Sequence, residues 1–323
     1  MIRRIKGKNI SVWFSFLIAV LVMLTVGMAF GGAAKATQKQ KTFSSPEEAV
    51  KAAITAARSN DDKELTAIFG PSTKELVYSG DAVADKQRRE QFLKSYDEKN
   101  SLVAEKDVMI VVIGKNDWPF PIPLVKKGEV WFFDTDKGKE EILNRRIGEN
   151  ELSTIQSCLA IVDAEREYAM KDVDGDGISE YADKFRSDPG KKNGLYWETK
   201  EGEKPSPLGP VAAKAKVEGY TGKKSGDKPS PFHGYYYRIL KAQGKNAPGG
   251  AYDYVLKGKM IGGFAVVAYP AAYGNSGIMT FIVNHDGVVY QKDLGAATAK
   301  TAQSMGRFDP DKTWKKVGDV PKP

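Results

Sequence analysis

Three aspartates at alternate positions form the most chemically specific pattern in the sequence. Asp172, Asp174 and Asp176 lead directly to Gly177. Calcium loops use this spacing, because alternate carboxylates converge on one hard cation while a glycine allows the chain to turn. The pattern predicts a structural calcium ion, and a solvated acidic turn is the alternative. The predicted ligands are Asp172, Asp174, Asp176, the carbonyl of Ile178, Glu180 and Asp183.

Aromatic side chains are the second group that could bind a partner. Exposed rings stack on sugars or peptides. Strand alternation places Tyr236 on the opposite face from its tyrosine neighbours, so one ring of that run is expected to be accessible. We interpret Trp197, Tyr236 and Trp118 as candidates for a surface that holds an envelope polymer or protein. Packing of these rings in the core is the alternative.

Motifs for enzymatic chemistry are weak. His233 and His285 are the only histidines, which excludes a histidine-rich metal centre. His233 is expected to be an ordinary packed or surface residue. His285 is expected to be a solvated residue in a turn. The run Gly274–Gly277 is one residue too short for a nucleophile elbow. These observations favour a non-enzymatic binding or structural module.

A hydrolase with a carboxylate-based site is the rival function. It should gather Asp or Glu side chains in one cleft. The carboxylates of Asp163, Glu165 and Glu167 lie along one predicted helix, and we expect them to form a solvated face instead.

The first thirty-six residues predict where the protein works. A basic start is followed by an apolar run from Ile10 to Phe30, and Ala34 and Ala36 then match a signal-peptidase site. This order is typical of an export signal, so we expect a periplasmic or secreted protein of the bacterial cell envelope. The run is also about long enough to span a bilayer, so contact with the membrane is expected only if this segment is retained as an anchor.

Charge and cysteine content exclude two classes of protein. Five of the 49 basic residues and none of the 41 acidic residues lie within residues 1–36, which leaves 44 against 41 and a net charge of +3. Such a small excess argues against nucleic-acid binding. Cys158 is the only cysteine, so no intramolecular disulfide can form, and its helical surroundings predict burial.

Hydrophobic periodicity predicts two α+β domains after the signal. Residues 43–147 are predicted to form helices followed by an antiparallel sheet. One helix is predicted over about 84–98 and a strand pair around Lys127 and Gly128. Residues 148–320 read as a long helix over 149–171 packed on an antiparallel sheet, whose first strand is predicted at Tyr235–Leu240.

Several sequence runs resemble the exported bacterial family called domain of unknown function 2950. The resemblance covers nearly all of the chain after the signal; it implies an envelope location and no activity. The runs that carry it are 117–123 (DWPFPIP), 145–151 (RRIGENE), 194–197 (GLYW), 232–240 (FHGYYYRIL), 262–265 (GGFA), 269–271 (YPA), 273–274 (YG) and 286–290 (DGVVY).

The C-terminal half is also similar to pilin-like heads. Its long helix opens at Asn150, is followed by the acidic loop, and leads to the strands around Tyr236 and Tyr269. The resemblance implies a helix packed on an antiparallel sheet. True pilins differ, because their apolar segment continues directly into that helix, whereas here residues 43–147 intervene.

Overall fold

The computed structural model describes residues 39–173, 175, 177–220 and 230–318. The predicted export signal at residues 1–36 lies outside them. Within the described ranges, no helix combines the length and the apolar character needed to cross a bilayer.

Helices followed by an antiparallel sheet form the N-terminal part, as the sequence predicts. Ser45 starts the first helix, because its hydroxyl accepts a hydrogen bond from the Glu48 amide at 3.2 Å. The helices are α1 (Pro46–Ser59), α2 (Asp62–Phe69), α3 (Thr73–Val77) and α4 (Ala82–Glu98). The strands are β1 (Asn100–Glu105), β2 (Val108–Ile113), β3 (Trp118–Pro119), β4 (Leu124–Lys127) and β5 (Val130–Phe133). They pair in the order β1-β2-β4-β5, with β3 also on β2, and the predicted turn at Gly128 joins β4 to β5.

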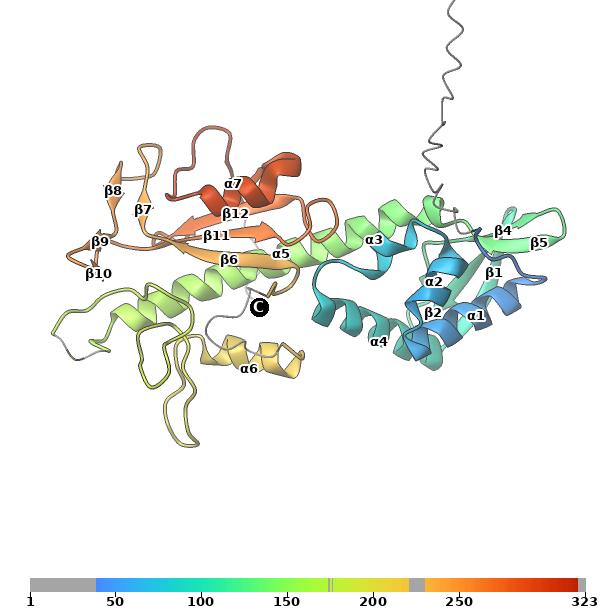
Figure 1. Ribbon diagram of the computed structural model, residues 1–323, viewed down its shortest axis with the longest axis horizontal. Helices are drawn as coiled ribbons and strands as arrows, with labels where there is room; N and C mark the ends of the chain where they lie inside the picture. Colours follow the sequence, from blue (N-terminus) through green and yellow to red (C-terminus); the bar gives the residue numbers. More distant parts are fainter. Residues whose placement is uncertain (1–38, 174, 176, 221–229, 319–323) are drawn as a thin grey trace, which may run out of the picture. The chain divides into compact units, whose positions relative to one another are not determined.

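Helix α5 (Thr135–Ala169) connects this part to the C-terminal sheet (Figure 1). It begins 14 residues before the helix start predicted at Glu149. Residues 135–148 are rich in charged side chains and include two glycines, so they carry no clear apolar period. Tertiary packing therefore extends the helix where periodicity gives no signal.

The C-terminal part is an antiparallel sheet covered on both faces. Neighbouring residues of β6 reach opposite layers: Tyr237 Oη donates to Thr154 Oγ1 of α5 at 3.3 Å, and Arg238 Nη2 donates to the Ala302 carbonyl of α7 at 2.8 Å. Its strands are β6 (Tyr235–Leu240), β11 (Ala265–Pro270), β12 (Met279–Asn284), β13 (Tyr290–Asp293) and β14 (Lys315–Lys316), in the order β14-β13-β12-β11-β6. Every residue of β11 is buried as a result.

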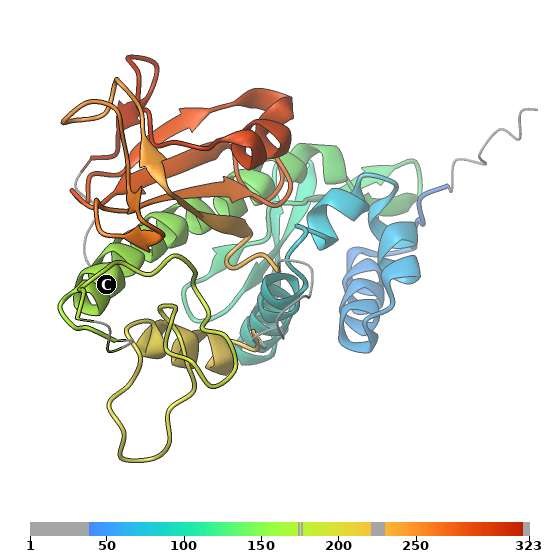
Figure 2. The ribbon, with the colours of Figure 1, turned by 60° about the vertical axis from the view of Figure 1, so that its left-hand side comes forward.

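Shorter elements complete the C-terminal part. They are α6 (Gly209–Val217), β7 (Ala242–Gln243), β8 (Tyr252–Asp253), β9 (Val255–Leu256), β10 (Lys259–Met260), the 3-10 helix η1 (Gly295–Ala297) and α7 (Thr298–Ser304). The Gln87 side chain of α4 donates to the Glu218 carbonyl, so the C-terminal end of α6 lies next to α4 (Figure 2).

Two hydrophobic cores support the α+β architecture. One core contains α1, α2 and the N-terminal sheet. The other contains the C-terminal half of α5 and the sheet formed by β6, β11, β12, β13 and β14. Cys158 lies in the second core as expected, and burial raises the pKa of its thiol to about 12. The division into domains at residue 147 stays a prediction, since α5 runs through that position without a break.

Candidate functional site

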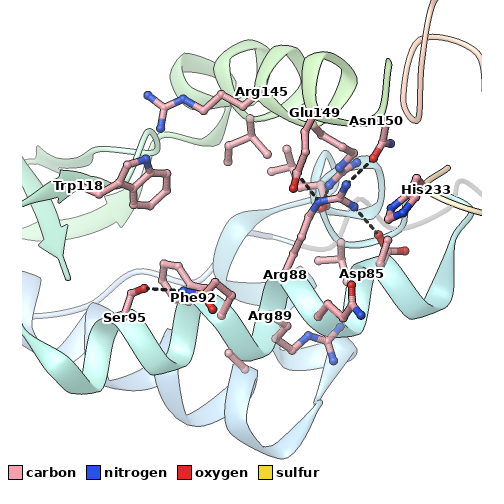
Figure 3. A pocket seen from close by; sticks show the side chains of 18 of the residues that line it. Asp85, Arg88, Arg89, Phe92, Ser95, Trp118, Arg145, Glu149, Asn150 and His233 are labelled. Atoms are coloured by element: carbon pink, nitrogen blue, oxygen red, sulfur yellow. Dashed lines mark hydrogen bonds and ion pairs between the residues drawn. The ribbon is translucent and has the colours of Figure 1, made fainter. Parts of the chain in front are cut away.

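A cavity of about 1020 Å³ lies between α4, α5 and the N-terminal sheet (Figure 3). Helix α4 covers it loosely: of its 17 residues only Ala84 is fully buried. The apolar side chains on its inner face, which include Phe92, are half-buried because they border open space. The volume lies at the upper end of the range for small-molecule sites.

One end of the cavity is lined by aromatic and aliphatic side chains. Phe92 of α4 lies 5.4 Å from Phe120 between ring centroids, and Trp118 of β3 lies 6.3 Å from Phe120. Ile142 of α5 completes this apolar end, and the Arg145 guanidinium lies 5.2 Å from the centre of the Trp118 ring.

The other end is polar and centres on Arg88 of α4. Its Nη2 donates to Asn150 Oδ1 at 2.6 Å, its Nε lies 3.5 Å from a Glu149 carboxylate oxygen, and its Nη1 lies 3.9 Å from Asp85 Oδ1. Figure 3 shows these groups and His233 together, away from the ring of Trp118. The cavity is therefore amphipathic along its length.

Arg146 adds a second guanidinium to the polar end. It is 5% exposed, and its hydrogen bonds reach the carbonyls of Glu75 and Leu76 and the side-chain oxygen of Asn275. Burial, and to a smaller extent the positive charge of Arg88, lower the pKa of Arg146 to about 10, and the negative charge of Asp85 opposes this shift. The group is still a cation at neutral pH.

The buried side chain of Asp81 holds the chain segments that border the polar end of the cavity. Asp81 caps α4 and accepts hydrogen bonds from the Tyr220 hydroxyl at 2.8 Å and the Gly234 amide at 2.9 Å. These bonds hold the segment that carries His233, whose Nε2 lies 3.5 Å from a Glu218 carboxylate oxygen. Burial lowers the pKa of His233, and the nearby Glu218 opposes that shift. His233 is thus a neutral, half-buried side chain at pH 7.

The three aromatic candidates lie in different environments. Trp118 lines the cavity. Trp197 and Tyr236 are half-buried against the C-terminal core, where the Lys192 ammonium lies 5.7 Å from the Trp197 ring and Tyr269 lies 5.6 Å from Tyr236. Their role in holding an envelope partner stays a prediction.

Two expectations about polar residues were wrong. His285, expected to be solvated, is half-buried with its ring 5.6 Å from that of Tyr254. Glu165, expected on a solvated helix face, is fully buried. The carboxylates that border this cavity are Asp85, Glu149 and Glu218, and their spacing along the sequence does not indicate it.

The acidic loop is described only in part. Asp174 and Asp176 lie outside the described residues, and Asp172 accepts the amides of Gly175 and Gly177 at 2.7 Å each. Glu180 lies 3.1 Å from the Lys259 ammonium and Asp183 lies 3.0 Å from that of Lys241. Ile178 is exposed. The described residues contain no group of three or more acidic, histidine or cysteine side chains placed to hold a metal, and calcium binding stays a prediction.

Calcium is expected to raise the melting temperature of the protein. Binding to the folded form alone adds about 2.7 kcal/mol at a hundredfold excess over the dissociation constant. The rise should appear at millimolar calcium, reverse with a chelator, and disappear in Asp174→Ala, while Asp163→Asn on the exposed face of α5 should retain it. Magnesium should substitute poorly, because it prefers tighter octahedral sites. Equal melting curves with calcium and with chelator would leave the loop as an acidic turn.

These observations define an α+β protein with an amphipathic cavity lined by its N-terminal part, by α5 and by the segments around Glu218 and His233. The chain belongs to a family of proteins of unknown function, DUF2950, whose match covers residues 40–317. No curated protein and no solved structure shows significant similarity to the chain.

Proposed function

We propose that this protein is exported to the bacterial cell envelope and binds a small, largely apolar molecule in the cavity without transforming it. The observation that carries the proposal is the amphipathic cavity: about 1020 Å³ of space with apolar walls and a few converging polar groups. Binding sites for small molecules have this composition. Export is supported by the order of basic, apolar and small residues in 1–36.

Three of the sequence runs that carry the family resemblance line this cavity. The run at 117–123 supplies Trp118, the run at 145–151 supplies Arg146 and Asn150, and the run at 232–240 supplies His233. Residues far apart in the sequence thus contribute to one space, which supports a role for the cavity rather than for the distant acidic loop.

A neutral apolar dye, N-phenyl-1-naphthylamine, tests the proposal. The dye should fluoresce on binding in the cavity, and Ile142→Gln should weaken its affinity about tenfold, because a polar amide replaces apolar surface that the dye would cover. Leu152→Gln is the matched control, since Leu152 lies on the same helix, is 54% exposed and is not part of the cavity wall. Equal weakening by both variants, or no saturable binding, would defeat the proposal.

A hydrolase with a carboxylate-based site is the second candidate. It is favoured by Asp85 and Glu149, which border the same cavity. Both carboxylates face the Arg88 guanidinium, at 3.9 Å for Asp85 and 3.5 Å for Glu149. Turnover of an ester or glycoside that is lost in Glu149→Gln would favour this candidate over simple binding.

We also propose that the C-terminal half is related to pilin-like heads. The packing of helix α5 on an antiparallel sheet supports this relation. Trp197 and Tyr236 lie in this half and are the candidates for contact with an envelope polymer or protein.

A further inference from the structure

Arg146 is a buried cation that makes no ion pair with a described carboxylate. Its three acceptors, the Glu75 and Leu76 carbonyls and the Asn275 amide oxygen, are all uncharged. Its Nε makes no hydrogen bond to a described residue, although the side chain is 5% exposed. A buried charge is costly unless a counter-charge compensates it, so this position favours an anion.

Arg88 brings a second positive charge to the same place. Arg88 donates to Asn150, which lies four residues after Arg146 on the same side of α5, so both guanidinium groups border the same end of the cavity. The Nη1 of Arg88 is also buried without a hydrogen bond in the described part of the chain, and its nearest carboxylate oxygen, on Asp85, is 3.9 Å away. Two like charges side by side repel each other, and an anion between them removes that repulsion.

The lining as a whole has an excess of positive charge. Five basic side chains and three acidic ones border the cavity, and His233 is neutral at pH 7. The acidic groups Asp85 and Glu149 lie against Arg88, and Glu218 lies against His233. Asp85 is a negative charge that acts on Arg146, but it forms no ion pair with Arg146 and lies against Arg88, so an anion bound directly at Arg146 would compensate its charge more fully.

We infer that the ligand of the cavity is an anionic amphiphile, whose carboxylate or phosphate group binds between Arg146 and Arg88 and whose apolar chain extends towards Phe92 and Trp118. The inference rests on the proposed binding function and adds the chemical class of the ligand. A planar guanidinium offers two parallel donors to such an oxyanion, which makes the contact both strong and oriented.

Laurate and its neutral analogue 1-dodecanol, titrated below their aggregation concentrations by calorimetry, test the inference. Both compounds contain twelve carbon atoms, with an alkyl chain of eleven carbons in laurate and of twelve in dodecanol, and their head groups differ in charge. The wild-type protein should bind laurate at least about tenfold more tightly, because hydrogen bonds to charged groups contribute more than neutral ones.

Arg88→Gln should abolish this preference while leaving the affinity for dodecanol unchanged. Arg88 is suitable because its side chain is 29% exposed, so the fold depends on it less than on Arg146. Arg145→Gln is the matched control: it removes the same charge at the apolar end, beside Trp118, and should retain the preference.

The outcomes separate this inference from the function on which it rests. Equal binding of laurate and dodecanol would overturn the anionic ligand and leave an apolar binding site intact. Loss of the preference in Arg145→Gln but not in Arg88→Gln would place the anion at the wrong end and overturn the inference. Failure of both compounds and of the naphthylamine dye to bind would overturn the binding function as well.

Discussion

The substitution Gly138→Ala is expected to lower the free energy of unfolding by about 2–3 kcal/mol. Gly138 lies in the first turns of α5, where a β-carbon would come within 2.5 Å of the Pro121 carbonyl oxygen and 2.7 Å of the Ile122 α-carbon. Both contacts are with backbone atoms, so no side-chain rotation relieves them. Because Ile122 lines the cavity, the same clash should also displace part of its wall.

Gly148→Ala on the same helix is the matched control, and its effect should have the opposite sign. A β-carbon at Gly148 meets no atom within 4 Å, and the residue is exposed. Alanine there should stabilise the protein by about 0.5–1 kcal/mol, because it restricts the unfolded chain and favours helix. Urea unfolding of the two variants measures both effects. If the Gly138→Ala protein is as stable as the wild type, α5 does not approach the backbone of Pro121 and Ile122 so closely.

Local patterns in the sequence predicted the regular elements well where one face is apolar. Strand β6 spans Tyr235–Leu240 as predicted, and the turn at Gly128 joins the predicted strand pair. The resemblance to the family, drawn from runs such as 145–151, is confirmed over residues 40–317. Each of these predictions depends on residues that are close together in the sequence.

The cavity could not be predicted, because it depends on the distance between elements. Phe92 lies on the inner face of α4, but a helical period does not tell whether that face meets another layer or open space. Trp118 was chosen as a binding residue for its ring, and its place in the cavity wall comes from the β3 pairing with β2. Arg88 carries no motif: Asp85 lies on its own helix, and its other partners, Glu149 and Asn150, come from α5.

Helical spacing alone separates Glu165 from the exposed face of its two acidic neighbours. Residues two apart on a helix point to opposite sides, whereas residues four apart share a side. Asp163 and Glu167 therefore share a face, and Glu165 between them must point away from it. The structure has this arrangement: Asp163 is exposed, Glu167 is half-buried and Glu165 is fully buried.

Glu165→Gln is expected to stabilise the protein at neutral and alkaline pH. The Glu165 carboxyl is fully buried; one oxygen accepts the Ala182 amide at 2.9 Å and the other has no hydrogen-bond partner in the described residues. Burial raises its pKa well above the ordinary value of 4.5; the Ala182 hydrogen bond opposes this shift and the negative charge of Asp183 adds to it. The folded protein therefore holds this proton more tightly than the unfolded chain does.

The sign of the pH dependence follows from that difference. The stabilising contribution of the proton is complete below about pH 4.5, the ordinary value, and is lost as the pH rises towards the raised pKa of the folded state. Over that window the wild type should lose about 1.4 kcal/mol of stability per pH unit relative to Glu165→Gln, because glutamine cannot ionise. The two proteins should be nearly equal in stability at pH 4.

Urea unfolding of the wild type and the variant at several pH values from 4 upwards measures this divergence. Asp163→Asn is the control, since it removes a negative charge from the same helix at a side chain that is 74% exposed. This variant should not reproduce the divergence seen with Glu165→Gln, because the Asp163 side chain is not buried. If the difference in the free energy of unfolding between Glu165→Gln and the wild type is constant across the pH range, the buried carboxyl does not hold a proton. The explanation given for its burial would then be wrong.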